Sequence, residues 1–310
     1  MTLKPNPFYY GRKARVNLFV PSIANDQTQY NDYLAGGLDI TSIPSSYVSH
    51  WKGKDVRVDQ VANEWLMPDL RTKPFNNVHC RLAVAYALDR NSISKQVLKG
   101  TSIPSYTVVP RGAFGHYSGK DNPHFDTTKA RAELAQCPGQ LNGVQIAYQH
   151  TSTDYDDEFS AIQSMLAAIG ANVKLLPMNL NDWLTVVTSA TMNHDQVAIV
   201  QDNWFDDYPD ASDFLDNILK SGAAYNLGGF HNVRFDRLVS QADSTANRTT
   251  RASLYRKAQH IALMSGAYIS VRQYSSFYLV KPTLHGFEPN QVFNTLWPKG
   301  GSWANISVGH

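Results

Sequence analysis

Short apolar segments alternate with helix-forming segments along most of this chain, and glycine or proline follows many of them. The clearest helix is residues 77–90, NVHCRLAVAYALDR, where apolar side chains recur at helical spacing and Asn77 can cap the first turn. Alternation of this kind predicts an α/β fold with a mixed β-sheet flanked by helices. Further strands are expected at 144–148, 173–176 and 196–200, and further helices at 158–169 and 181–189.

The two ends of the chain follow this pattern less regularly. Residues 14–20 are expected to form a strand, 27–35 a helix that ends at Gly36, and 38–40 a second strand, which together predict a βαβ unit. Near the other end, a β-rich tail is expected from Ile269. Helices are expected before it, near 212–219, 234–243 and 250–264.

Length and charge narrow the class of protein. A chain of 310 residues exceeds the usual size of a single core, so two lobes are expected. The 28 basic and 26 acidic residues give a net charge of +2, and no basic block is interleaved with aromatic residues, which argues against a nucleic-acid partner. No apolar run of about 18 residues predicts a membrane helix, and the first residues lack the apolar core of a signal peptide.

Cysteine and histidine give no sign of a metal site or another cofactor site. Cys80 and Cys137 do not have metal-ligand spacing; they either form one disulfide in an oxidising compartment or are two buried thiols. The ten histidines are scattered without a partner at ligand spacing. No cofactor and no bound metal are therefore expected.

The most informative segment is Gln201–Asp216, QDNWFDDYPDASDFLD, which holds six aspartates beside Trp204, Phe205 and Tyr208. It follows the apolar strand expected at 196–200, and ligands of open α/β sheets bind outside the carboxyl ends of strands. A carboxylate at that place can hold a ligand ammonium by a charge-assisted hydrogen bond. The alternative is a solvated acidic turn that caps the following helix.

A second alternative is a metal-dependent enzyme. Residues 206–210, DDYPD, match the D-D-x-x-D pattern of prenyl-diphosphate synthases, whose carboxylates share one helical face to bind Mg²⁺. Pro209 lies inside the pattern and would disrupt such a helix, and no second motif is present. Sequences typical of hydrolases and nucleotide-binding loops are also absent, so no enzymatic activity is expected.

Six segments taken together resemble the dipeptide- and oligopeptide-binding proteins of ABC transporters (family 5 of the solute-binding proteins). Two of them depart from the usual pattern, with Tyr10 where tryptophan is common and Ala211 where proline is common. They occur in the family's order and cover nearly the whole chain. The segments are 6–11 (NPFYYG), 34–40 (LAGGLDI), 75–90 (FNNVHCRLAVAYALDR), 204–215 (WFDDYPDASDFL), 230–238 (FHNVRFDRL) and 278–287 (YLVKPTLHGF).

The resemblance implies a periplasmic-binding-protein fold of type II, with two lobes that enclose a solute in a cleft between them. Members of this family are usually much longer, because an N-terminal part builds half of the first lobe and a smaller extra domain. Residues 1–70 with 281–310 are therefore expected to be the remainder of lobe I, which is incomplete here. Residues 71–280 are expected to form lobe II.

For the site, the resemblance implies that Asp207, and not Asp206, forms a salt bridge with the α-amino group of a peptide. Asn203, Trp204 and Phe205 are expected to lend backbone groups to the ligand as an added β-strand would. The expected partners are a peptide or other small solute, an ABC transporter permease, and the missing N-terminal half of lobe I. The family implies an extracytoplasmic location. The alternative is a truncated or split member that acts as a ligand-sensing or interaction module.

Overall fold

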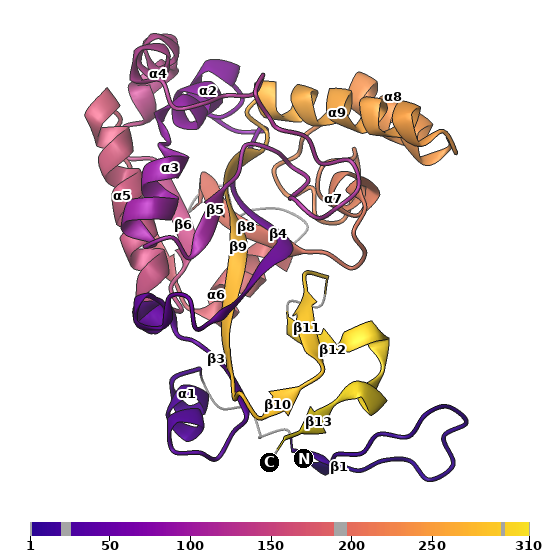
Figure 1. Ribbon diagram of the computed structural model, residues 1–310. Helices are drawn as coiled ribbons and strands as arrows, with labels where there is room; N and C mark the ends of the chain where they lie inside the picture. The colour runs from indigo at the N-terminus through magenta and orange to yellow at the C-terminus, as the bar shows by residue number, and fades with distance from the viewer. Residues whose placement is uncertain (1, 20–25, 189–196, 293–294, 310) are drawn as a thin grey trace. The chain divides into compact units, whose positions relative to one another are not determined.

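The computed structural model describes residues 2–19, 26–188, 197–292 and 295–309 (Figure 1). The chain divides into two compact units. Unit 1 comprises Met1–Gln60 and Ser275–His310, and unit 2 comprises Val61–Tyr274. The chain passes between them within two long strands, β4 (Val56–Pro68) and β9 (Ile269–Val280). Whether the units are the two expected lobes stays a prediction.

Unit 2 is built on a mixed sheet with strand order β5-β9-β4-β8-β6-β7. Antiparallel β4 and β8 pair over seven residues, from Ala62 opposite Phe205 to Pro68 opposite Ile199. Parallel pairing then joins β6 to β8 and to β7, as the strand–helix alternation predicts. The remaining strands are β5 (Ser102–Pro104), β6 (Gln145–Gln149), β7 (Lys174–Met178) and β8 (Ile199–Phe205).

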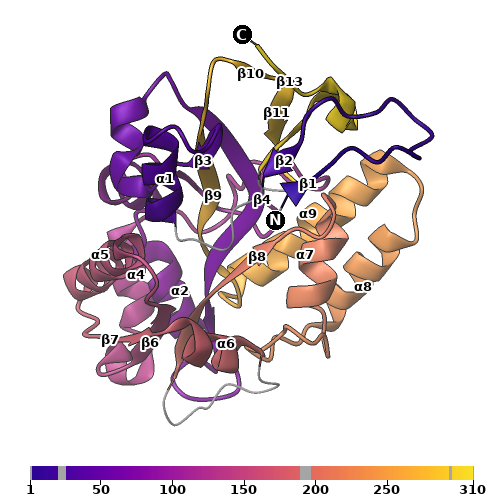
Figure 2. The same ribbon diagram turned by 90° about the horizontal axis from the view of Figure 1, so that it is seen from below.

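Helices cover both faces of this sheet. Figures 1 and 2 show α2, α4 and α5 on one side of it, and α7, α8 and α9 on the other. Neighbouring residues of β4 pack into opposite cores. Leu66 lies in the core beside α2, α4 and α5, and Trp65 lies in the core beside α7, α8 and α9. The helices are α2 (Val78–Ala87), α3 (Arg90–Ser92), α4 (Thr127–Leu134), α5 (Thr153–Ile169), α6 (Leu180–Thr188), α7 (Ala211–Ile218), α8 (Val233–Asp243) and α9 (Arg248–Met264), with short turns η2 (Ile93–Val97) and η3 (Pro138–Leu141).

Local signals account for several of these elements. The Asn77 side chain accepts a hydrogen bond from His79 N, so it caps α2 as predicted. Gly170 ends α5 in the left-handed conformation at φ 100°. That helix begins at Thr153, five residues before the predicted start, so Asp154 and Asp156 occupy its acidic first turn.

The two cysteines form a disulfide. Cys80 of α2 and Cys137, just after α4, are joined across a sequence separation of 57 residues, and both are buried in the core of unit 2. The structure therefore shows one disulfide and not two buried thiols, which were the two alternatives left by the sequence.

Unit 1 has a much smaller core, formed by Tyr30, Ile43, Phe277 and Leu279. The βαβ unit expected at 14–40 is wrong, because β2 pairs with antiparallel β1 and β3 pairs with β9. Val20, at the end of the strand expected there, lies outside the described residues, as do Ser189 and Gln196 at the ends of two other predicted elements. The elements are β1 (Thr2–Leu3), β2 (Leu18–Phe19), α1 (Asp26–Leu34), β3 (Ile40–Ser42), η1 (Ser45–Trp51), β10 (Leu284–His285), β11 (Phe287–Asn290), β12 (Thr295–Pro298), η4 (Lys299–Gly301), η5 (Trp303–Asn305) and β13 (Ser307–Val308).

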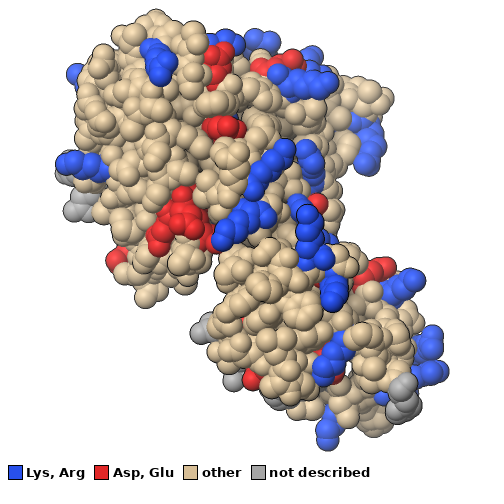
Figure 3. Space-filling view, turned by 60° about the vertical axis from the view of Figure 1, so that its left-hand side comes forward, with Lys and Arg blue, Asp and Glu red and all other residues tan. Residues whose placement is uncertain are grey.

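The surface matches the near-neutral net charge. The face in Figure 3 carries both acidic and basic side chains among many uncharged ones. Among the described helices, none is long and apolar enough to cross a membrane.

Candidate functional site

Strand β8 leaves part of one edge open. It pairs with β4 along its whole length, but with β6 only at Ile199 and Val200. Trp183 of α6 covers the next position, because its Nε1 donates to the Gln201 carbonyl at 2.8 Å. In the described part of the chain, Asn203 and Phe205 have no further strand beside them on this side.

The direction of the free backbone groups follows from one hydrogen bond. Asp206 N donates to Val61 O of β4 at 3.1 Å, so the backbone groups of Asp206 and, by alternation, of Trp204 point toward β4. Those of Asn203 and Phe205 therefore point toward the open edge. Asn203 N is already satisfied by Asp202 Oδ1 at 2.8 Å, which leaves the Asn203 carbonyl and both backbone groups of Phe205. An extended polypeptide placed here could bond to these groups.

The acidic segment begins inside β8 and not after it. The strand predicted at 196–200 runs on to Phe205, so Asn203, Trp204 and Phe205 are strand residues, and the turn starts at Asp206. The apolar run predicted the strand only as far as Val200, because aspartate and asparagine are unfavourable in strands, whereas the family resemblance implied a strand that reaches Phe205.

Three of the six aspartates in this segment have structural roles. Asp210 caps α7 by accepting from Ser212 N, and both its oxygens bond to Arg251 of α9, at 2.7 and 2.8 Å. Asp213 is fully buried and accepts from Trp204 Nε1 at 3.1 Å and from Asp207 N at 3.0 Å, which fixes the turn. Asp216 forms an ion pair with Lys220.

The other three aspartates differ in exposure. Asp202 is buried, and burial raises its pKa to about 8. Asp206 is half-buried; burial and the neighbouring charges of Asp213 and Asp207 raise its pKa to about 7. Asp207 is the one exposed aspartate of the six. Its backbone is held by Asp213 while its carboxylate faces solvent, which leaves it able to pair with an external cation.

This arrangement does not suit the metal-enzyme alternative. Asp206 and Asp207 lie in a turn, and Asp210 is engaged by Arg251 and by the start of α7. Among the residues that the structure describes, no group of three or more His, Cys, Asp or Glu side chains is placed to hold a metal ion.

Aromatic side chains lie near the end of β8 on both faces of the sheet. On one face Phe205 stacks on Tyr274 of β9, with ring centroids 5.3 Å apart. On the other, Trp204 meets Tyr225 edge to face at 4.8 Å. These contacts add side-chain surfaces to the backbone groups already described.

A buried ionic network lies beneath Phe205 and was not predicted. Tyr274 donates to Glu64 Oε2, and Arg272 bonds to the same oxygen at 3.0 Å. Arg272 also pairs with Glu158 of α5 at 2.9 Å. Burial raises the pKa of Glu158 well above its usual value, although Arg272 opposes this. Alternating polar and apolar residues in VRVDQVANEWLMP could have suggested β4, but not that Glu64 is buried.

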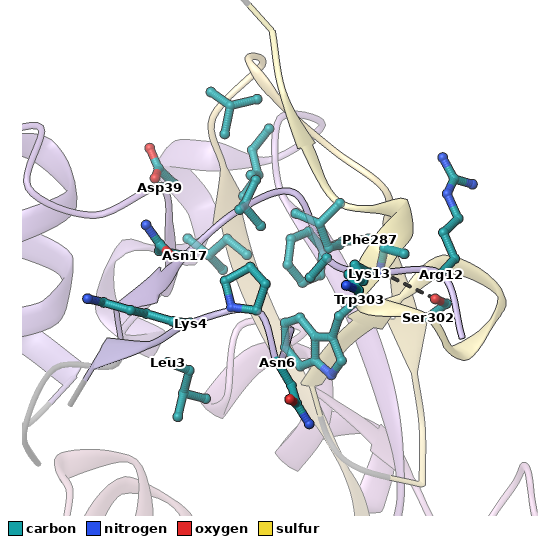
Figure 4. Close-up of a pocket in the computed structure, with 18 of the residues that line it drawn as sticks. Leu3, Lys4, Asn6, Arg12, Lys13, Asn17, Asp39, Phe287, Ser302 and Trp303 are labelled. Carbon is teal, nitrogen blue, oxygen red and sulfur yellow. Dashed lines mark hydrogen bonds between the residues drawn. The ribbon is translucent and has the colours of Figure 1, made fainter. Parts of the chain in front are cut away.

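Unit 1 contains a separate pocket of about 660 Å³ (Figure 4). Most of its walls are apolar, and Phe287 and Trp303 lie on one side of it. Lys4, Arg12 and Lys13 add positive charge. The pocket includes Asn6 and Tyr9 from the 6–11 segment that carried the resemblance. Residues 3–17, 37–40 and 284–308 supply nearly all of the lining.

The sequence profile of the bacterial extracellular solute-binding proteins, family 5 (middle region), matches residues 1–226. The chain belongs to this family. Curated relatives include the Escherichia coli protein named "Probable deoxycholate-binding periplasmic protein YgiS", 27% identical over 93% of this chain and 55% of the relative. The oligopeptide-binding protein OppA of Bacillus subtilis is 25% identical over 84% of this chain and 50% of the relative. The chain thus spans about half the length of these curated relatives.

Solved structures of family 5 share the fold. A structure titled "Crystal structure of a putative peptide binding protein AppA from Clostridium difficile" aligns with a TM-score of 0.84 at 16% identity, over 99% of this chain and 64% of its own. DppA from Helicobacter pylori, solved in complex with the peptide STSA, aligns with a TM-score of 0.78 at 21% identity, over 99% and 60%. The predicted α/β fold of the type II binding proteins is therefore confirmed.

Proposed function

We propose that this chain is the solute-binding component of an ABC importer and that it binds peptides or peptide-like solutes along β8. The free backbone groups of Asn203 and Phe205 would pair with the ligand backbone, and Asp207 would hold its α-amino group. The observation that carries the proposal is the open edge of β8 ending at an exposed carboxylate. Relatives named for peptide binding, and the family itself, which is one of solute-binding proteins, support it.

Isothermal titration calorimetry with tri-alanine tests the anchoring role. Because hydrogen bonds to a charged group contribute about 1.5–3 kcal/mol, Asp207→Asn should weaken binding roughly ten- to hundredfold. N-acetyl-tri-alanine, which lacks the amine, should bind the parent weakly and should lose little more in the variant. Asp216→Asn is the matched control, since that carboxylate pairs with Lys220. Unchanged affinity in Asp207→Asn would disprove the anchor, and no binding of tri-alanine by the parent would refute the function.

The function also implies partners and a location. A solute-binding component delivers its ligand to an ABC permease outside the cytoplasm, and relatives named as periplasmic proteins support that location. The Cys80–Cys137 disulfide suits an oxidising compartment.

We further propose that polypeptide equivalent to the unmatched part of the longer relatives covers the pocket of unit 1. The extra length of those relatives and the apolar walls of the pocket support this. Co-elution of the chain with the unmatched portion of B. subtilis OppA, lost in Trp303→Asp, is the expected result; separate elution would count against it.

A further inference from the structure

Phe205 and Tyr225 expose aromatic surface near the end of β8. Their exposed fractions are 45% and 42%, although each ring packs against a second aromatic ring. Exposed apolar side chains gathered at one place often mark a binding surface. Here they adjoin the free backbone groups of Asn203 and Phe205, on opposite faces of the sheet.

The partner rings are held by hydrogen bonds. The hydroxyl of Tyr274, on which Phe205 stacks, donates to the buried Glu64 and lies 3.0 Å from the Tyr155 hydroxyl. Trp204, which meets Tyr225, donates from Nε1 to the buried Asp213. Each exposed ring therefore packs against a fixed neighbour. The two rings would then lose little side-chain entropy when a ligand binds.

Strand geometry assigns ligand side chains to these surfaces. Residues directly opposite one another on neighbouring strands have their Cβ atoms about 4.5–5.5 Å apart on the same face. If the ligand amine lies at Asp207, the ligand backbone runs back along β8 and its second residue comes beside Phe205. The next residue would face the side of Trp204 and Tyr225, because side chains alternate.

We propose that Phe205 is a specificity-determining residue that selects peptides with a bulky apolar or aromatic side chain at the second position from a free N-terminus. The inference rests on the proposed function and names its substrate class. The Phe205 ring, stacked on Tyr274, offers an aromatic face to that side chain. An aromatic pair at this place should strengthen binding by about tenfold over alanine.

Calorimetry with Ala-Ala-Ala, Ala-Phe-Ala and Ala-cyclohexylalanine-Ala tests peptide binding and the selectivity at the second position separately. The expected result is tighter binding of both bulky peptides, a gain that disappears in Phe205→Ala and is largely kept in Phe205→Trp. Ala-Ala-Ala has no bulky second side chain, so its affinity should fall by less than that of the two bulky peptides in Phe205→Ala. Phe125→Ala, which removes another exposed phenylalanine of unit 2, should leave all three affinities unchanged.

The outcomes can be told apart. If Ala-Ala-Ala binds but the bulky peptides bind no tighter, the selectivity is refuted and the proposed function stands. The selectivity is also refuted if Phe205→Ala weakens all three peptides equally while its melting temperature stays at the parent value. If no peptide binds the parent, both the function and the inference fail.

Discussion

The open edge of β8 in unit 2 and the pocket of unit 1 differ in the structure that supports them. The sheet of unit 2 lies between two large apolar cores, and the buried Glu64–Arg272–Glu158 network supports it from within. The pocket walls of unit 1 come largely from two-stranded pairs and short turns, and the apolar core cluster found among the described residues of that unit has four buried members. A rigid edge can position hydrogen bonds for a ligand, whereas apolar walls with little support call for a covering partner.

The largest expected effect concerns the network of unit 2. Arg272→Met would leave Glu64 and Glu158 buried without their cation, and removing one partner from a buried ionic cluster costs about 3–5 kcal/mol. The free energy of unfolding, measured by urea denaturation, should fall by this amount. Arg256→Met, which breaks an exposed pair with Asp121, should cost less than about 1 kcal/mol. Equal losses in the two variants would show that the buried network supports the sheet of unit 2 no more than an exposed ion pair does.

The disulfide of unit 2 should come next in magnitude. Closing a loop of 57 residues lowers the entropy of the unfolded chain by an amount worth about 4 kcal/mol at 25 °C. The double variant Cys80→Ala, Cys137→Ala should lose this much in urea denaturation, and reduction of the parent should give a similar loss. Stability that did not change under reductant would show that the bond contributes nothing to unit 2.

Asp206 should make stability depend on pH at the end of β8. Its pKa is raised to about 7, so between pH 4 and 7 the unfolded chain has lost this proton while the folded chain keeps it. Stability therefore falls as pH rises through that window, and the loss is constant above it. Asp206→Asn should raise the melting temperature at pH 8 and leave it nearly unchanged at pH 3.5. Equal shifts at both pH values would mean that the carboxylate stays ionised in the fold.

The smallest effect on stability is expected from the exposed aromatics of unit 1. Phe8 and Tyr10 are 92% and 97% exposed, so replacing both by serine should change the free energy of unfolding by less than about 0.5 kcal/mol. Concentration-dependent association of the parent, measured by light scattering, should nevertheless decrease. A parent that stays monomeric at all concentrations would show that unit 1 needs no cover.

Sequence reasoning succeeded where signals were local. The cap at Asn77 depends on neighbouring residues alone, and the structure confirms it. It failed for β4, because Asn63 and Glu64 are tolerated in a buried strand only through distant partners. Asn63 bonds to the carbonyls of Thr107 and Val108, and Glu64 bonds to Arg272.

The candidate site was predicted in part for the same reason. Its place after an apolar strand was visible in the sequence, and the structure puts Asn203, Trp204, Phe205 and Asp207 together at the end of β8. The separate roles of the six aspartates were not visible, because Asp210 is engaged by Arg251, 41 residues away. The buried Tyr274–Glu64 support could not be predicted either. Ligand binding by these residues stays a prediction.

Hydrogen exchange at the Phe205 amide would report whether a ligand adds a strand to β8. In the free protein this N–H points to the open edge, whereas Asp206 N already donates to Val61 O. Saturation with tri-alanine should slow exchange at Phe205 by at least about a hundredfold, while the Asp206 amide changes little. If calorimetry shows binding but the Phe205 amide exchanges as fast as before, the ligand does not pair with β8 and the account is wrong.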